Sequence, residues 1–286
     1  KSLSEIQFIQ DGLSYVVLKH DCVSSNITNK RQSIRKLVDM ILSISESKKE
    51  NKISIRYLFD NEDDIKWLLF YIHYLNYKYT KRAKESSQED KEINIFSDSK
   101  INEDVVYEIK EISISKNSAR NLVNMRADEC TPSYFINLGK TFAEEYALKY
   151  HIFYDENLEK NNLNLIYNVG KGSGNRPGMI AIEYYGDFND GDSKEDKKIL
   201  ALIGKGVTFD AGGNNIKQTG FMETMFADKG GACAVFEAFK TAVQMKLKKN
   251  IVVVIPLVEN SCDGKAYRPS DILTSHKGLT VEITNT

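Results

Sequence analysis

Two lysines and one aspartate stand among four glycines in the stretch GKGVTFDAGGNNIK, residues 204–217. These residue types allow two kinds of chemistry. A lysine in a glycine-rich turn can hold a phosphate group, whereas a lysine and a carboxylate at the end of a strand can hold a metal ion. The phosphate pattern needs its lysine after four spacers and a second glycine, followed by Ser or Thr, and this stretch lacks that arrangement. The spacing therefore favours metal binding.

A second glycine-rich stretch, VGKGSGNRPG at residues 169–178, is a weaker candidate for a phosphate loop. Its third glycine comes one residue too early for the G-x-G-x-x-G pattern, and Pro177 follows where a helix should begin. The stretch gives little support for nucleotide binding.

The candidate metal ligands are Lys205, Asp210 and Asp228. Lys205 follows the apolar run ILALI, which predicts a buried strand, and open α/β sheets bind ligands at the carboxyl ends of their strands. The pair Gly212–Gly213 lets the backbone pass close to another group. Asp228 precedes a predicted helix, and its position fits a helix N-cap as well as a metal ligand.

The two lysines of the first stretch suit different tasks. Lys205 can donate a lone pair to a metal ion only as a neutral amine, so its pKa would have to be strongly lowered by a nearby dication. Lys217 lies farther along the same loop and can stay charged, which would allow it to polarise a carbonyl group.

The elements that must position these residues form two predicted domains, residues 1–115 and 116–286. In the first domain, strands at 13–18, 53–59 and 93–98 alternate with helices at 31–44 and 63–81, which predicts a small α/β domain with a mostly parallel sheet. Two predicted helices between about 105 and 147 break at 128–132, and the domain boundary falls inside the first of them. A third helix follows Asp228. The five strand candidates of the second domain are HIFYD, NLIYNVG, MIAIEYYG, ILALIG and NIVVVIPLV.

Composition excludes several classes of protein. The 286 residues are 41% hydrophobic and carry a net charge of −1, which gives no broad attraction to nucleic acid or to anionic membranes. The longest apolar runs are too short to span a bilayer. Four cysteines and four histidines are scattered, so we expect reduced thiols, a cytoplasmic location and a metal site built on carboxylates.

Three motifs resemble the leucyl aminopeptidase family of dinuclear metallopeptidases. They are GKGVTFDAGGNNIK, FADKGGACAV at 226–235 and YRPSDILTSHKGLTVEITNT at 267–286. The resemblance covers residues from about 118 to the end. It implies a small N-terminal α/β domain followed by a larger α/β catalytic domain with a mixed central sheet, whose C-terminal part is absent from this chain.

The resemblance also implies a mechanism. It assigns two divalent ions (zinc, manganese or magnesium) to Lys205, Asp210 and Asp228, and the polarisation of the scissile carbonyl to Lys217. In the family, the two ions activate a water molecule that removes an N-terminal amino acid, often leucine, from a peptide.

Three further residues match substrate-binding positions of the family. Phe221 and Met225 match positions that line the pocket for the first side chain, and Asn285 lies close to the substrate. The implied partners are short peptides with a free N-terminus and further copies of the chain, since family members are typically homohexamers.

The sequence departs from the family pattern in three places. Ala211 replaces a usual Ser, which we expect to be tolerated. Lys229 replaces a Met or similar apolar residue, and an added cation there could weaken metal affinity or shift substrate preference. The family's remaining ligands follow the NT pair in a DAEGR motif, so we expect the chain to continue past Thr286 and the fragment alone to be inactive. The alternative is a non-catalytic structural or regulatory relative without a complete metal centre.

Overall fold

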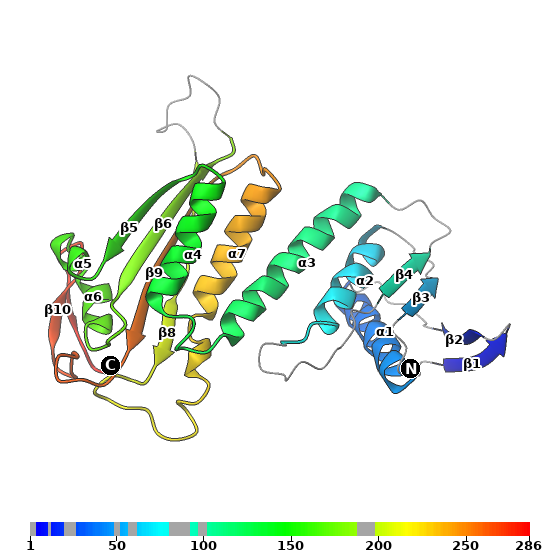
Figure 1. Ribbon diagram of the computed structural model, residues 1–286, viewed down its shortest axis with the longest axis horizontal. Coiled ribbons are helices and arrows are strands. Elements are labelled where there is room, and N and C mark those ends of the chain that lie inside the picture. Colours follow the sequence, from blue (N-terminus) through cyan, green and yellow to red (C-terminus); the bar gives the residue numbers. More distant parts are fainter. Residues whose placement is uncertain are drawn as a thin grey trace. The chain divides into compact units, whose positions relative to one another are not determined.

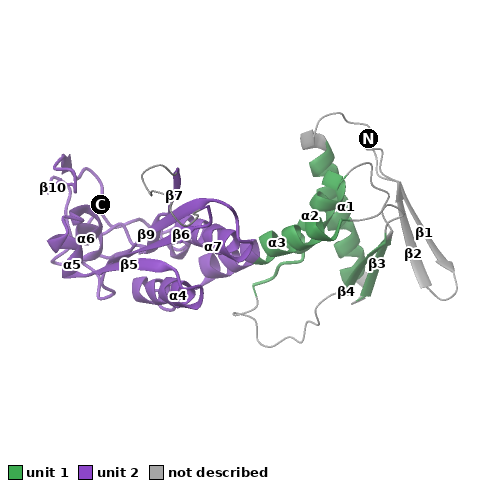
Figure 2. Ribbon diagram, turned by 90° about the horizontal axis from the view of Figure 1, so that it is seen from above, with its two compact units in different colours: residues 1–114 green, residues 115–286 purple. Residues whose placement is uncertain are grey.

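The computed structural model describes residues 4–10, 13–19, 27–48, 52–56, 62–79, 92–96, 102–187 and 198–286. It divides into two compact units, residues 1–114 and 115–286 (Figure 2). Helix α3 (Glu103–Asn124) passes from one unit into the other. Within these described ranges, no helix is long and apolar enough to cross a membrane.

Before α3, the described residues of the first unit form two helices and two small sheets (Figure 1). The helices are α1 (Ile27–Lys48) and α2 (Glu62–Leu75). β1 (Ser4–Gln10) pairs antiparallel with β2 (Leu13–Lys19), and β3 (Lys52–Arg56) pairs parallel with β4 (Glu92–Phe96). The predicted α/β alternation is present. The predicted strand at 13–18 nevertheless belongs to an antiparallel hairpin rather than to the parallel sheet, because its neighbour in sequence is also a strand.

The second unit is built on one mixed sheet with the order β5-β6-β9-β7, and β8 also pairs with β9. β6 is antiparallel to β5 and β9, whereas β7 and β8 are parallel to β9. The strands are β5 (Lys149–Tyr154), β6 (Gly178–Tyr185), β7 (Ile199–Ile203), β8 (Gly206–Asp210) and β9 (Asn250–Asn260). This arrangement confirms the predicted α/β class with a mixed central sheet.

Helices α4 (Pro132–Glu145) and α7 (Gly230–Gln244) pack on one face of this sheet (Figure 1). α4 begins where the sequence predicts, because the Thr131 side chain accepts a hydrogen bond from the Tyr134 N–H at 3.3 Å and Pro132 occupies the first turn. The remaining short elements are α5 (Glu156–Lys160), α6 (Asn164–Gly170), η2 (Met225–Ala227), β10 (Ile272–Thr274) and β11 (Thr280–Glu282).

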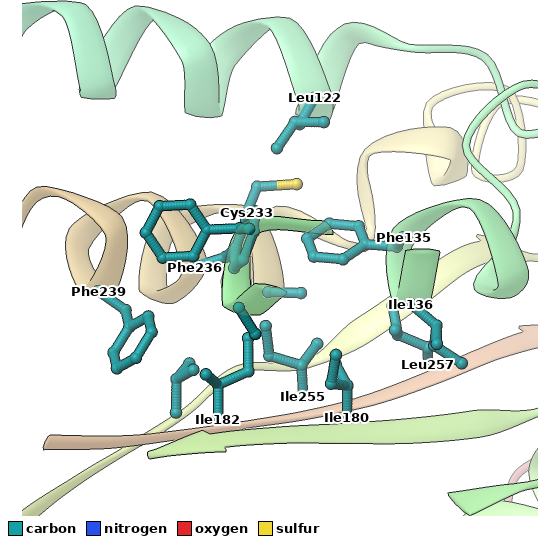
Figure 3. Packing of buried hydrophobic residues seen from close by; sticks show 14 of the residues in the cluster. Leu122, Phe135, Ile136, Ile180, Ile182, Cys233, Phe236, Phe239, Ile255 and Leu257 are labelled. Atoms are coloured by element: carbon teal, nitrogen blue, oxygen red, sulfur yellow. The ribbon is translucent and has the colours of Figure 1, made fainter. Parts of the chain in front are cut away.

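The core of the second unit lies between the sheet and these helices (Figure 3). Phe135 of α4 and Phe236 of α7 are fully buried, with ring centroids 5.5 Å apart in an edge-to-face arrangement. Ile180 and Ile255, from neighbouring strands, are also fully buried in this cluster. The core therefore fixes the start of α7 against the strands, and this junction carries the candidate ligands.

Three expectations from the sequence were wrong. NLIYNVG forms helix α6 instead of a strand, since a short apolar run does not distinguish the two. GVTFD, which was not predicted as a strand, forms β8. β7 is not buried: its Leu200 and Ile203 side chains, on opposite faces of the strand, are 55% and 69% exposed, because β7 ends the strand order and within the described residues pairs with β9 only.

Candidate functional site

The candidate ligands lie on the segments that join β7, β8 and α7. Lys205 lies between β7 and β8, Asp210 ends β8, and Asp228 follows η2, two residues before α7 begins. The backbone of Lys205 abuts the first turn of α7, since the Ala232 N–H donates to the Lys205 carbonyl at 2.9 Å. A Cβ atom added to Gly231 would lie only 3.0 Å from the Lys205 nitrogen. Gly231 is therefore needed for this close approach, whereas a Cβ atom at Gly230 would have no atom within 4 Å.

Lys205 and Asp228 form the first ion pair of the site. Nζ of Lys205 lies 3.0 Å from Oδ2 of Asp228. Oδ2 is buried, and no group in the part of the chain that the structure describes donates a hydrogen bond to it. The Lys205 amine thus lies within ion-pair distance of Oδ2 but is not oriented to donate a hydrogen bond to it. The buried oxygen therefore keeps lone pairs that are available to another group.

The N-cap alternative for Asp228 is not supported by the structure. The N-cap residue of α7 is Lys229, and the helix has no side-chain cap hydrogen bond. Asp228 instead ends the η2 turn, with its backbone N–H directed to the Met225 carbonyl.

Asp210 and Lys217 form the second ion pair, with Nζ of Lys217 3.1 Å from Oδ2 of Asp210. The other carboxylate oxygen, Oδ1, accepts hydrogen bonds from the Asn260 side chain at 2.7 Å and from the Gly212 N–H at 2.9 Å. Burial and the charge of Asp210 both raise the pKa of the nearby Tyr267 hydroxyl. Asp210 is therefore held by β9 and by its own loop while Lys217 faces its outer oxygen.

The Gly212–Gly213 pair passes close to Asn260 and to Thr286. Gly213 has φ +58°, and a Cβ atom there would lie 2.8 Å from Oδ1 of Asn260. The Thr286 hydroxyl donates to the Gly212 carbonyl and accepts from the Asn215 N–H at 2.8 Å. The sequence predicts that the backbone at Gly212–Gly213 passes close to another group. That group is the end of β9 together with the Asn285–Thr286 segment.

The predicted substrate-binding residues near this loop are half-buried or exposed. Phe221 is 69% exposed, Met225 begins η2 and is half-buried, and Asn285 is exposed.

Sequence reasoning missed the parts played by Asn260, Thr286 and Lys229. Asn260 follows the apolar run of β9 and pairs in register with Asp210, so its role depends on a strand pairing between distant segments. Lys229 is fully buried, and its amine donates to the carbonyls of Met125, Phe226 and Val123. Burial lowers the pKa of this amine.

The second glycine-rich stretch has a structural role. Ser173 Oγ and Asn175 Nδ2 donate to the Glu259 carboxylate at 2.6 and 2.9 Å. A Cβ atom at Gly172 would lie 2.6 Å from Cβ of Ala266. The stretch therefore ties the turn before β6 to the carboxyl end of β9.

The donor set fits part of a metal centre. Two carboxylates and one lysine converge on neighbouring elements, since β8 and η2 pack against each other. Within the described residues, however, no three His, Cys, Asp or Glu side chains come together as a metal site.

Comparison with known proteins places these features in a family. Residues 117–286 match the cytosol aminopeptidase family, catalytic domain. A probable cytosol aminopeptidase of Fusobacterium nucleatum is 30% identical over an alignment of 282 residues, and the alignment covers 92% of this chain and 56% of that protein. A probable cytosol aminopeptidase of Persephonella marina is 40% identical over 177 residues, 62% of this chain and 34% of that protein.

Solved structures show the same fold. The manganese complex of BotP, a bottromycin maturation enzyme, superposes with a TM-score of 0.78 at 24% identity, over 99% of this chain and 59% of that one. Leucine aminopeptidase of Caenorhabditis elegans gives a TM-score of 0.71 at 25% identity, over 82% and 46% of the two chains. The chain thus spans about half the length of such relatives. From the match over residues 117–286, the chain belongs to the cytosol aminopeptidase family.

Proposed function

We propose that the protein carrying this chain is a metal-dependent aminopeptidase that removes N-terminal amino acids such as leucine from short peptides. The observation that carries the proposal is the pairing of Lys205 with Asp228 and of Lys217 with Asp210 at one junction of a family catalytic domain. A homohexameric assembly and a cytoplasmic location are further proposals that rest on the family alone.

Lys205, Asp210 and Asp228 would contribute ligands to two divalent ions, which would be zinc, manganese or magnesium. Oδ2 of Asp228 supports this assignment, because it is buried, lies beside the Lys205 amine and accepts no hydrogen bond within the described residues, so its lone pairs are available to an ion. Bound divalent ions lower the pKa of a water molecule and polarise a carbonyl group. Manganese is the first ion to test, since one structural relative was solved with it.

The other site residues would act on the peptide directly. Lys217 would donate a hydrogen bond from its charged amine to the scissile carbonyl oxygen, leaving Asp210 free to bind an ion. Phe221 and Met225 would contact the first side chain of the peptide, and Asn285 would hydrogen-bond to its backbone. The exposure of Phe221 leaves room for such a side chain.

The alternative is a non-catalytic relative that supports other subunits. One observation favours it: the described residues hold two carboxylates and one lysine at the site, without a third acid or a histidine. This set is smaller than a two-ion centre needs.

The test compares metal binding and turnover in the purified full-length protein that carries this chain. We expect manganese titration by calorimetry to show binding, and we expect release of leucine from a leucyl peptide when manganese is present. Asp228→Asn should lower the manganese affinity by more than about tenfold, the loss known for groups that merely support a ligand. Asp104 is an exposed aspartate in the first turn of α3, so Asp104→Asn is the matched control. It should change neither the manganese affinity nor the release of leucine.

Binding of manganese without release of leucine would favour the non-catalytic alternative. Equal manganese affinity in Asp228→Asn and in the parent would remove Asp228 from the metal site.

A further inference from the structure

Lys229 is one of the largest fully buried side chains of the described chain, with 0% exposure. A lysine amine is seldom buried to this extent, since removing a charge from water is costly unless other groups replace the water. The groups around this amine therefore indicate why the residue is there.

Three backbone carbonyls surround the amine, and each lies at or near the end of a helical segment. The Met125 carbonyl accepts at 2.9 Å and the Val123 carbonyl at 3.4 Å, and the Phe226 carbonyl accepts as well. Helix α3 ends at Asn124, so its last carbonyls have no partner within the helix and carry the negative end of the helix dipole. The amine of Lys229 supplies both the donors and the positive charge that this helix end needs.

The same contacts fix the backbone on both sides of Asp228. Lys229 follows Asp228 directly, and Phe226 precedes it by two residues in η2. The amine thus draws the η2 turn and the start of α7 onto the end of α3. The Asp228 carboxylate takes no part in these contacts, and its Oδ2 lies 3.0 Å from the Lys205 amine instead.

We propose that Lys229 is a positioning residue that holds the Asp228 carboxylate in place for metal binding. This inference rests on the proposed function, since it takes Asp228 as a ligand. A positioning role and electrostatic repulsion of the metal predict opposite changes in metal affinity when Lys229 is replaced. A cation that merely repelled the metal would raise metal affinity when removed, whereas loss of a positioning residue lowers it.

The test measures the manganese affinity of Lys229→Met by calorimetry, beside Asp228→Asn. We expect Lys229→Met to bind manganese about tenfold more weakly than the parent, within the range known for groups that orient a metal ligand. Lys248→Met is the matched control, since Lys248 is exposed after α7, and it should bind like the parent. Lys229→Gln keeps two N–H donors and should fall between the parent and Lys229→Met, and it replaces Lys229→Met if that variant does not fold.

Hydrogen exchange of the metal-free protein gives a second measurement that does not depend on metal. We expect Lys229→Met to speed amide exchange in residues 225–229 and 123–126, while β9 keeps the parent rate.

The outcomes separate this inference from the proposed function. Unchanged or tighter manganese binding in Lys229→Met, together with weak binding in Asp228→Asn, would overturn the positioning role and leave the metal site intact. Parent-like binding in Asp228→Asn would overturn the proposed function, and the metal half of this inference with it. Unchanged exchange at 225–229 would overturn the inference in either case.

Discussion

Lys217 has the position and the accessibility that a group acting on a substrate needs. Its amine lies 3.1 Å from Asp210, and its side chain is 29% exposed. It is therefore close enough to the candidate ligands to reach a bound peptide without being locked in the core.

We predict that Lys217→Ala lowers kcat on a leucyl peptide by about 10²–10³-fold, the loss typical when one donor to a developing oxyanion is removed. The free energy of unfolding should change by less than about 1 kcal/mol, because partly exposed ion pairs contribute little. Steady-state kinetics and urea unfolding measure the two effects. An unchanged kcat would take Lys217 out of the mechanism.

Glu237 gives a pH dependence that is independent of the metal. The side chain is buried on α7, and burial raises the pKa of its carboxyl, while Lys240 at 2.9 Å opposes the shift. Because the pKa is higher in the folded protein than in the unfolded chain, Glu237 contributes stability that is fully present below its ordinary pKa of 4.5. That stability is lost as pH rises through the folded value.

We predict that Glu237→Gln removes this loss of stability with rising pH. The difference in unfolding free energy, variant minus parent, should become more positive as pH rises from about 4.5 toward neutrality. Urea unfolding at pH 5 and pH 7 measures it, and comparison with the parent cancels the other titrating groups. A difference that stays constant between the two pH values would contradict the raised pKa.

The sequence was sufficient to identify residue types at the site, but not their partners. Lys205 and Asp210 stand out because charged residues interrupt a glycine-rich segment, whereas the spacing at Asp228 fitted a helix cap equally well and the family resemblance favoured a ligand. Asn260 does not, because its contact with Asp210 exists only after β8 pairs with β9 across 50 residues. The side-chain direction of Lys229 was equally out of reach, since it depends on where α3 ends.

At the scale of elements, the junction between β7, β8 and α7 depends on Gly204. A Cβ atom at Gly204 would lie 2.4 Å from Cγ2 of Val235 and 2.7 Å from the Gly231 carbonyl oxygen, both on α7. The strand connection therefore packs directly against the backbone and the Val235 side chain of the helix, with no room for a side chain at Gly204.

We predict that Gly204→Ala destabilises the protein by about 1–3 kcal/mol, because the added methyl group must push α7 away from the strands. The matched control is Gly264→Ala, since no atom lies within 4 Å of a Cβ placed there, and it should be neutral or slightly stabilising. Urea unfolding of both variants makes the comparison. Equal stabilities would mean that α7 is not packed this closely.

Long periodic elements were predictable, and short ones were not. The apolar face of α1 and that of α7 repeat with helical spacing over several turns, and both helices were predicted. α6 was mistaken for a strand and β8 was missed, because five to seven residues carry too little periodicity to decide between helix, strand and loop. The mixed sheet depends on long-range pairing, and the family resemblance supplied it.

At the scale of the whole molecule, two hydrophobic cores share no residue. One includes Ile34 and Leu68 in the first unit, and the other includes Phe135 and Ile255 in the second. All candidate ligands lie in the second unit. The two cores give each unit its own source of stability.

The single tryptophan of the chain makes this separation measurable. Trp67 lies on α2 and packs against the core of the first unit, with the Arg31 guanidinium 3.9 Å from its ring centroid. Tryptophan fluorescence therefore reports on the first unit, whereas far-ultraviolet circular dichroism reports on both.

We predict that urea unfolding of the chain gives two transitions by circular dichroism, of which fluorescence follows only one. Non-coincident probes are the standard sign that unfolding is not a single cooperative step. The fragment 102–286, which keeps α3 whole, should reproduce the dichroism transition that fluorescence does not follow. It should also retain the manganese affinity of the full chain, because every candidate ligand is present in it. Coincident transitions in the full chain, or a fragment that does not fold, would mean that the second unit depends on the first.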